Sequence, residues 1–114
     1  MSFVEAFSNK LEVFMSLADV KEDGSWLRTY DENGRQIAVM SKNNMELSGI
    51  GSEFFVCLDG SWIRTYDSNC KQIAVMSANN MQIKSAAGQN FTCKDGSWIR
   101  TYDKNCKQVN VRSA

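Results

Sequence analysis

The apolar residues of this chain fall in short runs separated by Asn, Asp and Gly. In the middle of the chain, strand-like runs occur at 54–58, 62–67, 73–77 and 81–85, and the run at 62–67 is rich in aromatic and β-branched residues. The pairs between them, Asp59-Gly60, Asn69-Cys70 and Asn79-Asn80, are typical of tight turns. Proline is absent, so nothing blocks strand pairing. The pattern predicts an all-β chain of antiparallel meanders.

Alternation along these strands predicts two faces. Two-residue loops at Asp59-Gly60 and Asn69-Cys70 would place Cys57 opposite Trp62 and Arg64 opposite Val75, and a three-residue loop at Asn79-Asn80 would pair Val75 with Ile83. The face expected to form the core carries Phe55, Cys57, Trp62, Tyr66, Ile73, Val75, Met81 and Ile83. The other face carries Thr65, Asp67, Gln72 and Ala74, with Ile63 and Met76 as apolar exceptions. Apolar groups on both sides indicate a closed or two-layer structure.

The same nine-residue phrase, Asp-Gly-Ser-Trp-Ile/Leu-Arg-Thr-Tyr-Asp, begins at Asp23, Asp59 and Asp95. Segments 23–41 and 59–77 agree at 15 of 19 positions, as do segments 59–77 and 95–113. The phrase therefore recurs every 36 residues. Repeats with a period of about 20 to 50 residues are typical of solenoids and pseudo-symmetric arrays. We therefore expect one domain over 1–114, with units at about 4–36, 37–72 and 73–108 and a closing strand at 109–114.

The N-terminal segment permits two interpretations. Alignment with the later copies predicts strands at 3–8 and 11–13. The apolar residues Phe3, Phe7, Leu11, Phe14 and Ala18 nevertheless follow helical spacing. The alignment favours strands, and a helix remains the alternative.

Three four-stranded units predict a closed pseudo-threefold body of the β-prism or β-trefoil type. A β-solenoid is the alternative, which the partial copy at 109–114 favours. The segment 55–67 followed by Ile73-Ala74 resembles the units of bulb-type mannose-binding lectins, and this resemblance implies a β-prism of three four-stranded sheets. The sugar-binding signature of that family is Gln-x-Asp-x-Asn-x-Val-x-Tyr, and here its positions hold Leu58, Gly60, Trp62, Arg64 and Tyr66. Only the tyrosine matches, so the resemblance concerns architecture and does not carry mannose binding.

Composition narrows the function classes. The 13 basic and 13 acidic residues balance, so no charge excess points to nucleic acid or membrane. No apolar stretch approaches the length of a membrane span, and the first residues lack a secretory pattern, so we expect a cytoplasmic location. Histidine is absent, as are a phosphate loop and a nucleophile elbow. The sequence therefore predicts a protein that is not an enzyme and uses no cofactor.

The cysteines and repeated aspartates also have plain structural interpretations. Cys57, Cys70, Cys93 and Cys106 occupy two equivalent repeat positions with no Cys-x-x-Cys pair, which argues against zinc and predicts four free thiols. The acids near the turns show no EF-hand spacing, and turn-forming Asp is common.

The candidate site residues are the aromatic and arginine side chains of the repeated phrase. Alternation puts each arginine on the same face as its flanking tryptophan and tyrosine. Two interpretations stay open: the arginines bind carbonyls of adjacent units or stack on the aromatic rings, or they form three equivalent anion or sugar sites. The set is Trp26, Arg28, Tyr30, Trp62, Arg64, Tyr66, Trp98, Arg100 and Tyr102.

The leading functional hypothesis is a small binding module with repeated sites, for carbohydrate or another small polar ligand. A second is a structural or homo-oligomeric protein, with Ile63, Met76 and Phe54 as subunit contacts. A third is binding of single-stranded nucleic acid on the Trp-Arg-Tyr strands, which the zero net charge disfavours.

Overall fold

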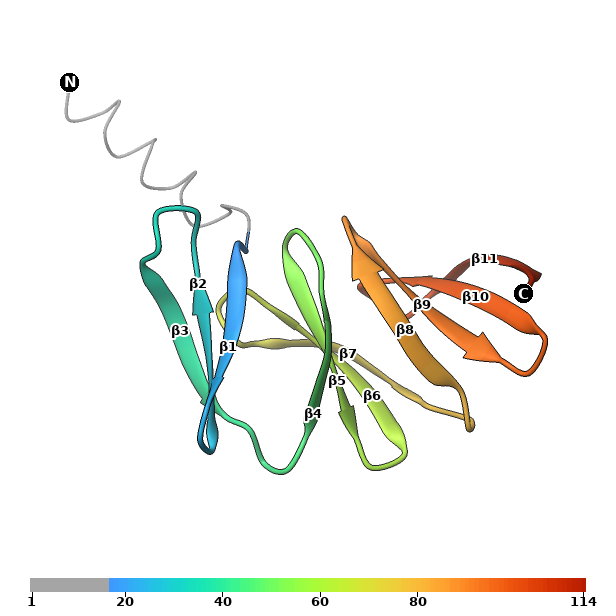
Figure 1. The fold of residues 1–114 in the computed structure, drawn as a ribbon, viewed down its shortest axis with the longest axis horizontal. Coiled ribbons are helices and arrows are strands. Elements are labelled where there is room, and N and C mark those ends of the chain that lie inside the picture. The colour runs from blue at the N-terminus through green and yellow to red at the C-terminus, as the bar shows by residue number, and fades with distance from the viewer. Residues whose placement is uncertain (1–16) are drawn as a thin grey trace, which may run out of the picture.

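The protein is all-β in the part of the chain that its structure, a computed structural model, describes, namely residues 17–114. Eleven antiparallel strands form three sheets, and this range contains no helix (Figure 1). The strands are β1 (Asp19–Asp23), β2 (Trp26–Tyr30), β3 (Gln36–Ser41), β4 (Glu46–Ile50), β5 (Phe54–Asp59), β6 (Trp62–Asp67), β7 (Gln72–Ser77), β8 (Gln82–Ala87), β9 (Asn90–Asp95), β10 (Trp98–Asp103) and β11 (Gln108–Ser113). The segment 1–16, where a strand or a helix was expected, lies outside the described residues.

Each sheet is a meander of consecutive hairpins. The first sheet has the order β1-β2-β3, the second β4-β5-β6-β7 and the third β8-β9-β10-β11. The three sheets follow one another along the long axis of a body measuring 56 × 32 × 19 Å (Figure 1). The expectation of a closed pseudo-threefold body is therefore wrong, because the sheets form an open row. They stack face against face, and among residues 17–114 no strand pairing joins the first sheet to the last.

The hairpin made by the repeated phrase turns one residue later than expected. Asp59 is paired with Trp62, so the loop is Gly60-Ser61, and Gly60 has a φ of 61°. A glycine at this position avoids the steric cost that a side chain would meet at positive φ. Cys57 consequently lies opposite Arg64 rather than Trp62. The observed register thus differs from the expected one by two residues. Because side chains alternate between the faces with a period of two, each residue of β5 and β6 still lies on its expected face.

The next hairpin has the expected register over most of its length. Arg64 is paired with Val75, as predicted, but a β-bulge after Thr65 brings Gln72 rather than Ile73 opposite Tyr66. The same irregularity occurs between β2 and β3 and between β10 and β11. A bulge turns one extra residue out of the ladder, and here it sets Gln72 on the face that carries the arginine.

The Asn-Asn pairs connect sheets instead of closing hairpins. Asn79 and Asn80 have φ values of 49° and 62°, and the turn that they form joins β7 of the second sheet to β8 of the third. Asn tolerates this left-handed conformation better than most residues. The predicted pairing of Val75 with Ile83 therefore does not form, and the expected fourth strand of each unit begins the following sheet.

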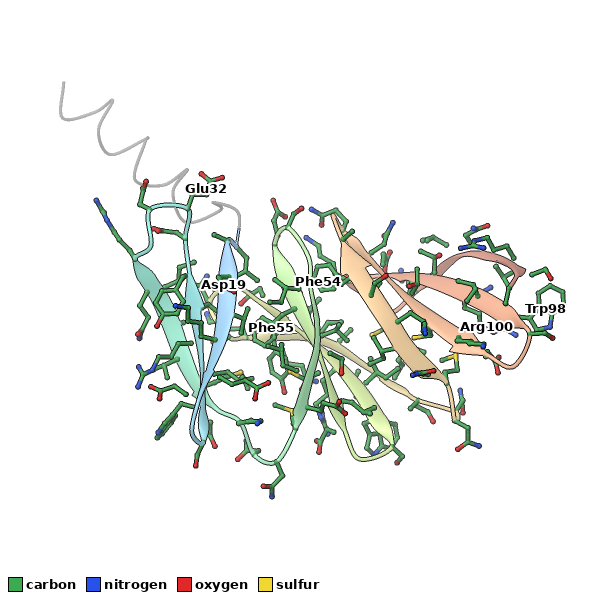
Figure 2. The ribbon with its side chains drawn as sticks, viewed as in Figure 1. Asp19, Glu32, Phe54, Phe55, Trp98 and Arg100 are labelled. Atoms are coloured by element: carbon green, nitrogen blue, oxygen red, sulfur yellow. The ribbon has the colours of Figure 1, made fainter. Side chains whose placement is uncertain are left out.

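Two hydrophobic clusters fill the spaces between successive sheets. Val20 and Leu27 of the first sheet pack with Phe55, Cys57 and Tyr66 of the second. The second cluster, between the second and third sheets, contains Phe54, Val56, Ile63, Phe91, Cys93 and Tyr102. Phe54 and Phe55, both labelled in Figure 2, are fully buried although they are neighbours on one strand.

The middle sheet is thus covered on both faces, and this explains its apolar residues on the face that was expected to be mostly polar. Ile63 is fully buried and Met76 is partly buried against the second cluster. These two residues and Phe54, proposed from the sequence as subunit contacts, instead make contacts within the chain.

Backbone and hydroxyl hydrogen bonds reinforce the stacking. Thr29 Oγ1 donates to the carbonyl of Ser68, and Thr65 Oγ1 donates to the carbonyl of Lys104, each at 2.7 Å. The connection between β4 and β5 also bonds to the turn between β8 and β9, where the Ser52 amide donates to the Gly88 carbonyl at 2.8 Å. Such bonds fix the register of one sheet on the next.

The outer faces of the row are more polar than the inner ones. Asp19 and Lys21 hold the first-sheet positions that correspond, 36 residues earlier, to Phe55 and Cys57. At the other end, the third sheet has Asn90, Thr92, Lys94 and Arg112 where the second has Phe54, Val56, Leu58 and Met76. Terminal units of stacked proteins commonly carry such polar outer faces, which keep them from associating further.

Candidate functional site

Three tryptophans, each the first residue of its strand, are half exposed. Trp26, Trp62 and Trp98 have exposed fractions of 46%, 48% and 48%. Trp62 shares a face with the buried Phe55 and Tyr66, yet the covering first sheet leaves it open. Its expected place in the core is therefore wrong, as is that of Val75. In Figure 2, Trp98 projects from the outer part of the third sheet.

Each arginine of the repeated phrase is held within its own sheet. Arg64 Nε donates to Asp59 Oδ2 at 2.9 Å, and its Nη1 donates to Gln72 Oε1 at 3.1 Å. Arg28 makes the equivalent bonds to Asp23 and Gln36, and Arg100 makes them to Asp95 and Gln108. The arginine thus spans three strands of one sheet. Neither the predicted bond to an adjacent unit nor stacking on the aromatic rings is the arrangement observed.

Two of the three candidate tyrosines belong to the core. Tyr66 stacks on Phe55 with ring centroids 5.3 Å apart, and its hydroxyl lies 3.5 Å from Met45 Sδ. Tyr102 stacks in the same way on Phe91. Burial raises the pKa of both tyrosines, because an ionised phenol would lose its hydration there. Tyr30 is only half buried, and the Lys21 ammonium lies 5.6 Å from the centre of its ring.

In each sheet, three further residues lie beside the tryptophan and the arginine. Asp59 lies opposite Trp62 and Val75 opposite Arg64, while Gln72 reaches the guanidinium. We call each such group a tryptophan patch: Trp62, Asp59, Arg64, Gln72 and Val75 in the second sheet, Trp26, Asp23, Arg28, Gln36 and Val39 in the first, and Trp98, Asp95, Arg100, Gln108 and Val111 in the third. The valine could be predicted from the sequence, because the expected register already paired Arg64 with Val75. The bulge that brings in Gln72 left no clear signal in the sequence.

The charges within a tryptophan patch compensate each other. Each arginine is ion-paired with one aspartate at 2.8 to 3.0 Å. Both partners keep substantial exposure, so the pair adds little to stability but fixes where the guanidinium lies. The patch offers a flat indole beside a neutral group of fixed donors and acceptors.

The cysteines serve packing. All four are free thiols, and burial raises the pKa of Cys57 to about 12 and that of Cys93 to about 11. Cys70 and Cys106 occupy turns at a φ of 63° and are half buried against the inter-sheet clusters. Such protonated, packed thiols are unsuited to nucleophilic chemistry.

The carboxylates of the repeated aspartates at the second turn of each sheet already accept hydrogen bonds from the backbone. Asp67 Oδ1 accepts from the amides of Asn69 and Lys71 at 2.9 and 3.0 Å. Asp31 and Asp103 make the same pair of bonds in their own turns. Over residues 17–114, no group of three or more metal-ligating side chains comes together.

A polar hollow of about 470 Å³ lies where the chain passes from the first sheet to the second. It is bordered by the turn between β1 and β2 and by the connection between β3 and β4. Its lining residues are Gly24, Ser25, Ser41, Lys42, Asn43, Asn44 and Met45. None of them was singled out from the sequence, because serine and asparagine in turns carry no distinctive pattern.

Comparison with known proteins assigns the chain to no family: no protein-family model and no curated protein matches it. Within the described range, no helix is long and apolar enough to cross a membrane.

Proposed function

We propose that this protein is a non-enzymatic binding module whose three tryptophan patches bind neutral, hydroxyl-rich ligands, with carbohydrate as the ligand class. The observation that carries the proposal is the half exposure of Trp26, Trp62 and Trp98 at equivalent places in three sheets. An indole with one open side is a suitable platform for the apolar face of a sugar ring. Covering it would contribute on the order of 2 kcal/mol per patch.

The polar neighbours of each indole support the same ligand class. Asp59, Arg64 and Gln72 are held to one another in an almost fixed arrangement. A ligand that binds there meets donors and acceptors whose side-chain entropy has largely been lost already, which favours affinity. Vicinal hydroxyl groups can both donate to the carboxylate and accept from the guanidinium.

The other two hypotheses receive less support. Each arginine is neutralised by an aspartate, so the patches lack the positive field that single-stranded nucleic acid requires. Of the residues proposed as subunit contacts, Phe54 and Ile63 are buried and Met76 is partly buried against the second cluster, while the outer faces of the row are polar. A homo-oligomer would therefore need another surface.

Titration with a panel of neutral oligosaccharides, followed by tryptophan fluorescence and calorimetry, tests the proposal. We expect Trp62→Ala to remove one of the three sites, so that calorimetry finds a lower stoichiometry at unchanged affinity, and the triple tryptophan-to-alanine variant to abolish binding. Val109→Ala is the matched control, because this valine is 54% exposed and lies outside the tryptophan patches. Absence of binding to every oligosaccharide at millimolar concentration, or binding unchanged in the triple variant, would contradict the proposal.

A further inference from the structure

The polar hollow adjoins the tryptophan patch of the first sheet. Ser25 directly precedes Trp26, and Ser41 is the cross-strand partner of Trp26 in the ladder between β2 and β3. Ser41 therefore both borders the hollow and lies beside Trp26 on the same face of the sheet.

The first sheet departs from the second at this place in two positions. Lys42 stands where the second sheet has Ala78, and Glu22 stands where it has Leu58. Ala78 is buried and Leu58 packs against the same hydrophobic cluster. In the first sheet the corresponding contact is an ion pair, with Lys42 Nζ 2.8 Å from Glu22 Oε1.

The ion pair is not needed to form the turn. The amide of Lys42 donates to the Ser25 carbonyl at 2.7 Å, and the amide of Ala78 donates to the Ser61 carbonyl at 2.8 Å. The following i to i+3 bonds, Met45 to Lys42 and Met81 to Ala78, are likewise the same. Since alanine supports the same backbone, the structural role of the turn does not explain the lysine.

Several polar groups around the hollow keep hydrogen-bonding capacity. Ser41 Oγ is bonded to Asn43 Oδ1 at 3.0 Å. Within residues 17–114, the Ser25 hydroxyl and the Asn44 carboxamide have no protein partner, and the Lys42 ammonium has two N–H groups beyond its bond to Glu22. Lys42 is the one charged residue among those that line the hollow, and its ammonium is compensated by Glu22, which lies outside the lining.

We infer that this hollow is a binding subsite for one residue of a neutral polyhydroxylated molecule, continuous with the patch at Trp26. The inference rests on the proposed function for its ligand class, and it assigns a different role to the first sheet. The first patch holds two adjoining ligand residues, one on the indole and one in the hollow, where the second sheet has Ala78 in place of Lys42. Two-residue ligands bind most tightly at the first sheet.

The test uses the full chain and cellobiose, a neutral disaccharide, in a titration followed by two-dimensional NMR. We expect shifts of the Ser25, Asn43 and Asn44 amides together with the indole of Trp26. Lys42→Ala, which introduces the residue of the second sheet, should weaken binding at the first sheet at least threefold while the indole shifts of Trp62 and Trp98 persist. Ser25→Ala, which removes a hydroxyl that lines the hollow, should act in the same direction, and Lys84→Ala at an exposed position of β8 is the control.

The outcomes separate the subsite from the proposed function. Indole shifts without shifts at the hollow would overturn the subsite and leave the tryptophan patches standing. Shifts at the hollow without indole shifts would support the subsite and contradict the patches. Tighter binding of glucuronate than of glucose at the hollow would overturn the assignment of a neutral ligand.

Discussion

The hydroxyl of Thr65 in the second sheet donates a hydrogen bond to the backbone carbonyl of Lys104 in the third, at 2.7 Å. Thr29 makes the equivalent bond to Ser68 between the first two sheets. Thr101 occupies the corresponding place in the third sheet, but no further sheet among the described residues covers it. The repeated phrase thus contributes an inter-sheet hydrogen bond from its first two copies, whereas the Thr101 hydroxyl of the third copy is left uncovered.

Removing the threonine hydroxyl should lower stability where it bonds to the next sheet and have little effect where no sheet covers it. We expect Thr65→Val to lower the free energy of unfolding by about 1–3 kcal/mol, because the Lys104 carbonyl loses its partner in a partly buried interface. Thr101→Val is the matched control and should change it by less than about 0.5 kcal/mol. Urea unfolding of both variants checks the prediction. Equal losses in the two variants would contradict a specific role for the inter-sheet bond.

The polar outer face of the third sheet should limit the length of the row. Lys94 and Arg112 stand where the middle sheet has Leu58 and Met76, both packed against the next sheet. Replacing them with those residues, as Lys94→Leu with Arg112→Met, exposes a large apolar area around Ile99. We expect self-association that rises with concentration in light scattering. The matched variant Lys84→Leu should leave the mass unchanged, and an unchanged mass in the double variant would refute the explanation.

Alkaline pH should destabilise the protein through Cys57. Its pKa is about 12 in the folded protein and about 9 when exposed, so between these values the folded state holds a proton that the unfolded state has released. Stability is therefore fully present below pH 9 and falls above it, by about 1.4 kcal/mol per pH unit for this one group. Cys57→Ala should reduce that slope although it lowers stability at neutral pH. Chemical unfolding between pH 8 and 11 measures both effects, and an unchanged slope would show that other groups control the alkaline loss.

Gly51 should tolerate no side chain. A Cβ at this position would collide with the Phe54 ring and lie 2.7 Å from the Gly88 carbonyl oxygen, which accepts the bond from Ser52. We expect Gly51→Ala to cost more than about 2 kcal/mol, measured by thermal unfolding. Gly34→Asn is the comparison, because its turn has open space and asparagine accepts positive φ. A Gly51→Ala protein as stable as the parent would contradict the close approach of the two connections.

The candidate site could be predicted in part. The repeated phrase identified each tryptophan and arginine, and strand alternation put them on one face. Whether Trp62 or Tyr66 would be covered could not be predicted, because both lie on that face and only the extent of the preceding sheet distinguishes them. The partners Asp59 and Gln72 depend on a turn placed one residue later than expected and on a bulge. The hollow arises from the connection between two sheets, which local sequence does not describe.

The amino-acid sequence by itself determined the strands, most of the turns and the division of each strand into two faces, because these depend on period-two alternation and on residues that accept tight turns. Only the tertiary structure decided how the meanders associate. A four-stranded sheet with apolar residues on both faces can close into a ring or stack in a row, and local preferences are the same in both. Here the choice rests on long-range contacts: Thr29 and Thr65 bond to the turns of the following sheet, and the middle sheet is buried from both sides. These contacts join residues far apart in the chain, beyond the reach of any local pattern.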